Sequence, residues 1–180
     1  MTRIAILKRE ELNAEQGRVY DEAKAANAPV GGPYYAYIRN PKLFIASQEM
    51  GKAIGSFKLT GRERQIAVLT VCRFWNAKYP WGAQARNSLS QGVDQPIIDA
   101  INAGKTPALP NPREAMAHKL AKELLTNKGL SEATYQEAEK LFGSDDLVGL
   151  IAGVGQFSMV CCSANGFDIT PPAEFQKLSV

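Results

Sequence analysis

Residues 60–75 read TGRERQIAVLTVCRFW, and this stretch decides the fold class. Thr60 and Glu63 have the three-residue spacing of a capping box, in which side chains and backbone N–H groups bond reciprocally at the start of a helix. The apolar residues that follow keep helical spacing and are Ile66, Leu69, Val71, Cys72 and Trp75. The stretch therefore predicts a helix with one buried face that begins at Thr60.

Pro80 is expected to end or bend this helix, because proline has no backbone N–H and its ring clashes with the preceding turn. A second helical piece is predicted from about Trp81 to Gln91, with Gly92 behind it as a C-terminal residue. The sequence thus predicts one long helix that continues past a bend at Pro80. A bend of this kind frees backbone carbonyls beside which a ligand can bind.

Similar start and stop signals recur along the chain. A capping box at Asn13 and Gln16 opens one predicted helix, and Asn40-Pro41 opens the next. Further helices are predicted over residues 13–26, 40–57, 94–103, 111–128, 131–142 and 144–166, with an extended tail from Thr170. Because no stretch shows convincing strand alternation, the sequence predicts an all-α fold.

The last predicted helix is apolar on nearly all sides. Its apolar positions are Leu147, Val148, Leu150, Ile151, Val154, Phe157, Met159 and Val160. A helix of that composition is expected to be buried, and in a 180-residue chain an interface between copies is a natural place to bury it. We therefore expect a homo-oligomer.

Composition narrows the class of protein. With 180 residues, 45% of them hydrophobic and 22% charged, the chain has the size and balance of one globular domain. No apolar run reaches the roughly 20 residues of a membrane span, and the first ten residues lack a signal-peptide core. We expect a soluble, cytoplasmic protein without a membrane partner, and a net charge of +3 is too mild to indicate nucleic acid.

Charge is unevenly distributed along the sequence. Residues 31–92 hold nine basic and two acidic side chains, a local charge of +7, whereas residues 93–180 hold seven basic and eleven acidic ones. Two solvated faces would explain this pattern. The alternative is that the central segment attracts a small anionic substrate.

Three cysteines and one histidine carry little site chemistry. Cys72, Cys161 and Cys162 are odd in number and have no ligand-like spacing with His118, so neither a disulfide framework nor a metal site is predicted. Core packing is the favoured role for the cysteines, although Cys72 has a pocket thiol as its alternative. His118 is interpreted as a surface or structural residue. No metal and no other cofactor is expected.

The candidate site lies between Gln65 and Gln84. Its predicted members are Gln65, Cys72, Arg73, Asn76, Tyr79, Trp81 and Gln84. Aromatic walls with a few polar groups are typical of small-molecule sites. The planar guanidinium of Arg73 would suit a substrate carboxylate. Two simpler interpretations stay open: Arg73 faces solvent or an interface carboxylate, and the bend at Pro80 serves packing only.

The order of these segments resembles the carboxymuconolactone decarboxylase family, which includes alkylhydroperoxidase D-like proteins. The resemblance covers most of residues 10–170 and rests on Gly32-Pro33, Asn40-Pro41-Lys42-Leu43, residues 59–65 (LTGRERQ), residues 76–81 (NAKYPW) with Gly92-Val93, and residues 153–160 (GVGQFSMV). It implies one domain over residues 1–180 with a core over about 40–165. It also implies a subunit of about seven to eight helices that assembles as trimers or hexamers.

The family's peroxidase members carry Cys-x-x-Cys-x-x-x-His and an upstream glutamate, and the matching positions here are Ala77, Pro80, Gln84 and Gln65. A branch without cysteines reads Tyr-Glu-Trp-x-x-His where this chain has YPWGAQ over residues 79–84. Peroxide reduction of this type needs a thiolate and a second sulfur, and glutamine cannot act as a base. Glutamine can still hydrogen-bond to a substrate oxygen. The resemblance therefore implies a binding pocket without the thiol relay.

Three functions remain open. The first is a cofactor-independent lyase or isomerase acting on a small carboxylated lactone or oxo-acid, with an arginine on the carboxylate. In it Gln65, Tyr79 and Gln84 would surround the reacting carbonyl and stabilise an enolate-like state. The second is an alkylhydroperoxidase-type antioxidant activity that would depend on Cys72. The third is a non-catalytic oligomeric binder of small molecules.

Overall fold

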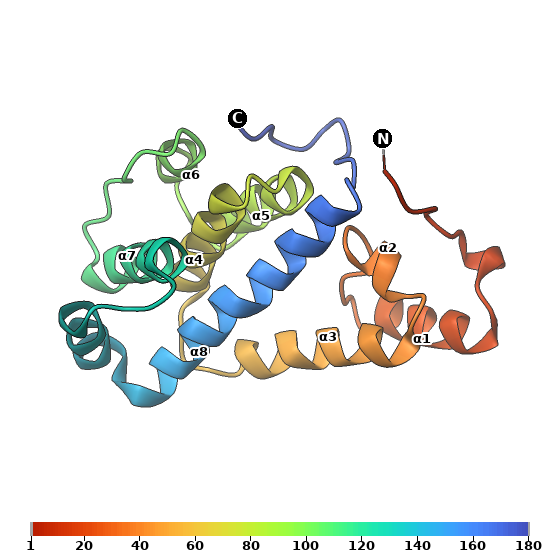
Figure 1. Ribbon diagram of the computed structural model, residues 1–180, viewed down its shortest axis with the longest axis horizontal. Coiled ribbons are helices and arrows are strands. Elements are labelled where there is room, and N and C mark those ends of the chain that lie inside the picture. The colour runs from red at the N-terminus through yellow and green to blue at the C-terminus, as the bar shows by residue number, and fades with distance from the viewer. Residues whose placement is uncertain (1, 180) are drawn as a thin grey trace.

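The computed structural model describes residues 2–179 and is all-helical over that range, which confirms the predicted fold class (Figure 1). A 3₁₀ turn, η1 (Arg9–Glu11), precedes eight α-helices. These are α1 (Ala14–Ala25), α2 (Tyr34–Tyr37), α3 (Pro41–Gly55), α4 (Gly61–Phe74), α5 (Lys78–Ser90), α6 (Gln95–Asn102), α7 (Pro112–Asn127) and α8 (Glu132–Gly166).

α4 is the central helix of the main core, and it packs against α5, α6, α7 and α8. Its side chains Ile66, Leu69 and Val71 are completely buried, and Trp81 of α5 is buried in the same cluster. The capping box forms as predicted, because Glu63 N–H donates to Thr60 Oγ1 and Thr60 N–H donates to Glu63 Oε2. Residues 60–75 therefore form the centre of the main core.

A smaller cluster joins the N-terminal helices to the rest. Val19, Tyr34, Tyr37 and Phe44 are buried together between α1, α2 and α3, and α3 runs along α8 (Figure 1). The hydroxyl of Tyr37 also hydrogen-bonds to Ser163 Oγ of α8 at 2.8 Å. The aromatic segment after Gly32-Pro33 is thus a single helical turn that fastens the N-terminal part to α8.

The predicted bend at Pro80 is wrong. α4 ends at Phe74, and the chain turns at Asn76, whose φ is 48°. Ala77 N–H donates to Cys72 O and Asn76 N–H to Arg73 O, the bonding pattern of a Schellman motif, in which asparagine tolerates the left-handed position. Pro80 lies in the first turn of α5, where its missing N–H would have no intrahelical partner.

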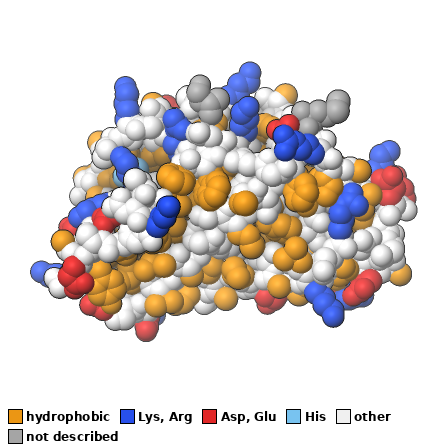
Figure 2. All heavy atoms as spheres, in the orientation of Figure 1, with side chains coloured by type: hydrophobic (Ala, Val, Ile, Leu, Met, Phe, Trp, Pro, Cys, Tyr) orange, Lys and Arg blue, Asp and Glu red, His pale blue; other side chains and the backbone are white. Residues whose placement is uncertain are grey.

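α8 contains the two last predicted helices and is interrupted at Gly143, whose φ is 73° and ψ 163°, as the sequence predicts. By length and composition alone α8 could cross a membrane, although core helices of soluble proteins pass the same test. A third of its most apolar window is buried, and Val148 is 59% exposed. Figure 2 shows hydrophobic side chains gathered on the face formed by α8 and α3. Much of the apolar surface of α8 is therefore not covered within one chain.

Candidate functional site

A cavity of about 620 Å³ lies between α3, α4, α5 and α8. The segment before α2 and the C-terminal tail complete its wall, through residues such as Pro29, Gly31 and Phe175. The volume matches that of small-molecule sites, which lie mostly in the range of roughly 300–1,000 Å³. Its lining is mainly apolar, with a small number of polar and charged side chains.

The structure brings Gln65, Tyr79 and Gln84 to the lining of this cavity. Gln65 comes from the buried face of α4, and its Oε1 accepts a hydrogen bond of 3.1 Å from Ser88 Oγ of α5. Gln84 lies in α5 and accepts from Asn87 Nδ2 at 3.4 Å. Ser88 thus donates to the side-chain carbonyl of Gln65. The N–H₂ group of the same Gln65 amide remains available to donate to a ligand.

The Tyr79 side chain packs against Gly31 and Gly32, the two glycines before α2, and against the ring of Tyr35. A Cβ on Gly32 (φ 63°) would lie 2.5 Å from Tyr79 Cε1, so the ring depends on a residue without a side chain there. The ring also meets that of Tyr35 edge-on, with centroids 6.4 Å apart. Burial, followed by the influence of Tyr35, raises the pKa of Tyr79 to about 12. The phenol therefore stays protonated and can donate a hydrogen bond.

The charges at the cavity are one-sided. Among the described residues that line it are three cationic side chains, Lys52 of α3, Arg64 of α4 and Arg86 of α5, and no acidic one. Arg64 donates to Phe57 O at 3.4 Å, Arg86 lies 5.3 Å from the centroid of the Phe175 ring, and Lys52 bonds to Glu49 at the surface. Within residues 2–179 no carboxylate forms an ion pair with Arg64 or Arg86. The cavity therefore favours an anion.

The other predicted site residues lie outside the lining. Arg73 donates from Nε to Asn102 O at 2.9 Å and bonds to the side chain of Asn76, which occupies the turn after α4. Trp81 is completely buried in the main core. The position of Trp81 follows from the turn at Asn76, because α4 ends before it and α5 starts after it in a new direction. Arg73 precedes the turn and lies on a face of α4 that meets the end of α6.

The thiols also lie apart from the cavity. Cys72 is completely buried, and its Sγ lies 3.9 Å from Sγ of the equally buried Cys161. Burial, and then the neighbouring thiol, raises the pKa of Cys72 well above its usual value. Within residues 2–179 no group of three or more potential His, Cys, Asp or Glu ligands could hold a metal ion. The lining thus offers hydrogen bonding and positive charge rather than thiol chemistry.

Sequence reasoning missed several members of the site. Lys52, Arg64 and Arg86 were counted only within the positive charge of residues 31–92, which is the one signal that includes them. Gln156 of α8 and Phe175 of the tail gave no signal, because the fold brings them to the cavity from far along the chain.

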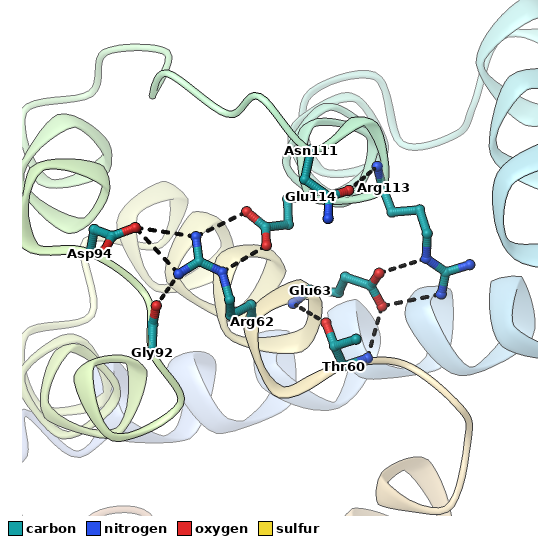
Figure 3. A network of polar contacts seen from close by, with 8 residues as sticks. All are labelled: Thr60, Arg62, Glu63, Gly92, Asp94, Asn111, Arg113 and Glu114. Carbon is teal, nitrogen blue, oxygen red and sulfur yellow. Dashed lines mark hydrogen bonds and ion pairs between the residues drawn. The ribbon is translucent and has the colours of Figure 1, made fainter.

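A second polar cluster, the ion-pair cluster of Arg62, Glu63, Arg113 and Glu114, joins the first turns of α4 and α7 (Figure 3). Arg62 Nε lies 2.7 Å from Glu114 Oε1, and Arg113 Nε lies 2.6 Å from Glu63 Oε1. Both carboxylates are at least 95% buried by residue. Because each one has an arginine partner, the cluster fastens two helices and leaves no charge for a ligand.

His118 is buried rather than at the surface, and it bonds through Nδ1 to Thr70 Oγ1 at 2.8 Å. The Thr70 hydroxyl donates its proton to the backbone carbonyl of Ile66. Its oxygen therefore accepts from His118 Nδ1–H, and the interpretation of His118 as structural fits this contact between α4 and α7. Burial, and then Lys122, lowers the pKa of His118 to about 4.

No family model and no curated protein matches the sequence. Two similar solved structures are an uncharacterized peroxidase-related protein from Silicibacter sp. TM1040 and an alkylhydroperoxidase AhpD core, an uncharacterized peroxidase-related protein, from Ralstonia eutropha JMP134. Both are 18% identical to this chain and cover 97% of it. The matched regions span 93% and 94% of those chains, with TM-scores of 0.79 and 0.77. This likeness shows that the chain has the alkylhydroperoxidase D-like helical fold.

Proposed function

We propose that the chain binds a small organic carboxylate in the cavity and acts on it as a cofactor-independent lyase or isomerase, the substrate being a carboxylated lactone or oxo-acid. The observation that carries this proposal is the cavity lining, which holds three cationic side chains and no acidic one among the described residues. Two of these cations, Arg64 and Arg86, form no ion pair with a carboxylate within residues 2–179. A guanidinium matches a carboxylate with two parallel hydrogen bonds, so Arg64 or Arg86 would hold the substrate.

The uncharged polar groups would then stabilise the reacting carbonyl. Tyr79 donates from a phenol that stays protonated, and the amides of Gln65 and Gln84 add N–H donors on two neighbouring helices. In the decarboxylation of a 3-oxo acid, the C–C bond to the carboxylate breaks and CO₂ leaves, while the electron pair of that bond moves toward the carbonyl oxygen. These donors stabilise the resulting enolate, which water then protonates. A 2-oxo acid has no such route and serves as a probe of binding only. The described lining holds no carboxylate or imidazole to remove a proton, which favours decarboxylation over isomerisation.

A direct test is calorimetric titration with a panel of small 2-oxo and 3-oxo carboxylates. Arg86→Met and Arg64→Met should each weaken binding about tenfold, the usual size of one charge-assisted contact. Arg18→Met is the matched control, because Arg18 pairs with Glu22 at the surface of α1 and should leave binding unchanged. Equal binding by wild type and both cavity variants would contradict the proposal.

Turnover separates an enzyme from a non-catalytic binder. We expect CO₂ release from a bound 3-oxo acid to fall at least tenfold in Tyr79→Phe, while calorimetry gives a dissociation constant within about threefold of wild type. Tyr135→Phe, at a 39% exposed position of α8 outside the cavity lining, is the control. Binding without turnover of any panel member would favour the non-catalytic binder.

A thiol peroxidase is the second candidate, because both similar structures are described as peroxidase-related proteins. It would require Cys72 and Cys161, whose sulfur atoms are close together but closed to solvent. Peroxide turnover with a dithiol reductant, abolished by Cys72→Ala and retained by Cys162→Ala, would support this function over the lyase. Absence of such turnover would remove it.

We further propose that copies of the chain associate through the apolar face of α3 and α8. Leu43, Met50 and Val148 are between 43% and 59% exposed on these helices, and burying such surface favours association. Sedimentation equilibrium in detergent-free buffer should give a multiple of 19.6 kDa. A monomer, or a protein that needs detergent to stay in solution, would contradict this proposal.

A further inference from the structure

The C-terminal tail, residues 170–179, crosses from the end of α8 over α5 to α6 (Figure 1). Phe175 lies in the middle of this tail and lines the cavity. Its ring meets that of Tyr79 edge-on, with centroids 5.6 Å apart, and the Arg86 guanidinium lies 5.3 Å from its centroid. One tail residue therefore touches both the phenol and a cation of the site.

Phe175 reaches α5 because residue 82 has no side chain. A Cβ on Gly82 would lie 2.5 Å from Phe175 Cβ and 2.9 Å from its Cγ, closer than real Cβ contacts. Glycine inside a helix is less favourable than alanine. At Gly82 it gives the tail room to pack directly on the backbone of α5.

The tail is fastened on both sides of Phe175. On one side, Asn102 donates from Nδ2 to Lys177 O at 3.1 Å and accepts at Oδ1 from Ser179 N–H at 2.8 Å, and Leu178 between them is buried. Asn102 is itself 8% exposed, and its backbone carbonyl accepts a hydrogen bond from Arg73 Nε. On the other side, Thr170 N–H donates to Thr2 Oγ1 at 3.0 Å. The tail therefore forms a strap with fixed ends.

We infer that this strap is part of the ligand site and that Phe175 determines which ligands fit. The inference rests on the proposed function, because it assigns Phe175 to the same carboxylate cavity. Phe175 closes one wall and so limits the length of the apolar part of a carboxylate ligand. Its ring also restrains Arg86 through a cation–π contact and so holds the guanidinium toward the carboxylate. Phe175 is thus a positioning and specificity-determining residue.

The test uses calorimetry with straight-chain 2-oxo acids from 2-oxobutanoate to 2-oxodecanoate. Wild type should prefer the short members. Phe175→Ala should bind the short acids about fivefold more weakly and shift the preferred length by two or more carbons. Gly82→Ala leaves Phe175 in the chain but displaces the strap, and should shift the preference in the same direction. Phe74→Ala, at a 47% exposed position outside the cavity lining, is the matched control with no shift.

Hydrogen exchange gives a readout that needs no ligand. Asn102→Ala should raise exchange at least tenfold in residues 173–179 and measurably in residues 78–87, while α7 keeps its protection. If wild type binds 2-oxo acids and neither Phe175→Ala nor Gly82→Ala moves the preferred length, the inference is wrong and the proposed function stands. If wild type binds none of them, the proposed function fails for this substrate class. In that case, unchanged exchange in Asn102→Ala would also overturn the strap.

Discussion

Arg62 and Arg64 are two residues apart in the first turns of α4, yet they belong to different regions of the molecule. Arg62 enters the ion-pair cluster, where Glu114 accepts its guanidinium hydrogen bonds and Gly92 and Asp94 add further contacts. Arg64 lines the cavity, where only the carbonyl of Phe57 accepts from it among residues 2–179. The same residue type is saturated by the protein in one region and left with donors to spare in the other.

This difference separates two uses of charge. A buried charge without a partner is costly, and separating α4 from α7 would leave the buried carboxylates of the ion-pair cluster without their arginines. The cluster therefore holds these two helices together. Arg64 and Arg86 at the cavity are partly solvated, so the fold tolerates them without a carboxylate partner. We therefore expect variants of the ion-pair cluster to change stability, and variants of the cavity to change binding.

The largest expected effect is in the ion-pair cluster. Arg113→Met leaves the 2% exposed carboxylate of Glu63 without its partner and also removes the contact of Arg113 with the ring of Phe142. Breaking a buried pair in this way costs about 3–5 kcal/mol of unfolding free energy. Urea denaturation at pH 7 measures it. Lys119→Met, which breaks an exposed pair with Glu137, should cost less than about 1 kcal/mol. Equal costs for the two variants would mean that burial of Glu63 does not matter.

A smaller loss of unfolding free energy is expected on acidification. It comes from His118 of α7, which contacts Thr70 of α4. Its folded pKa of about 4 lies below the ordinary 6.5, so between these values the unfolded chain binds a proton that the folded chain does not. Stability must therefore fall as pH drops below 6.5, by roughly 2–3 kcal/mol at pH 4.5. Burial raises the pKa of Glu63, but the bonds from Arg113 and Thr60 outweigh it and hold that pKa below 4.5, so Glu63 acts at lower pH.

His118→Asn isolates this contribution, because the asparagine amide can still donate toward Thr70 and does not titrate. Comparison of urea midpoints at pH 7 and pH 4.5 should show a loss in wild type that is smaller in His118→Asn by the amount given above. The same loss in both proteins would show that other groups cause the acid sensitivity.

The smallest effect on stability should come from the cavity. Arg64→Met is expected to change the unfolding free energy by less than about 1 kcal/mol, because no buried carboxylate depends on Arg64. Arg62→Met, two residues away, leaves the 5% exposed Glu114 with no guanidinium partner and should cost several kcal/mol. Similar melting temperatures for the two variants would remove the distinction between the regions.

Local signals were enough to predict most of the helices. Asn13, Asn40, Thr60, Asn111 and Ser131 all cap helices where the sequence places the starts, because a cap depends only on residues within one turn. The error at Pro80 has the opposite origin. Proline breaks a helix in its interior but is accepted in its first turn, and the sequence alone did not reveal that Asn76 would take the left-handed conformation first.

The candidate site was predictable only where chain neighbours form it. Gln65, Tyr79 and Gln84 lie on two consecutive helices and reach one cavity. Arg73 and Cys72 lie on faces of α4 that meet other elements, since each step along a helix turns the side chain by about 100°. Lys52, Gln156 and Phe175 reach the cavity through tertiary packing, to which no local pattern in the sequence corresponds.

Arg64 and Arg86, which form no ion pair within residues 2–179, also act at a distance. Their summed field extends beyond the mouth of the cavity over about 8–10 Å at physiological ionic strength, so an approaching anion is drawn toward it while diffusing. We therefore expect encounter with a small carboxylate to be faster than with a neutral molecule of the same size, and this advantage should shrink as salt is added. Citrate and phosphate buffers should compete for the same field and slow the binding of other anions.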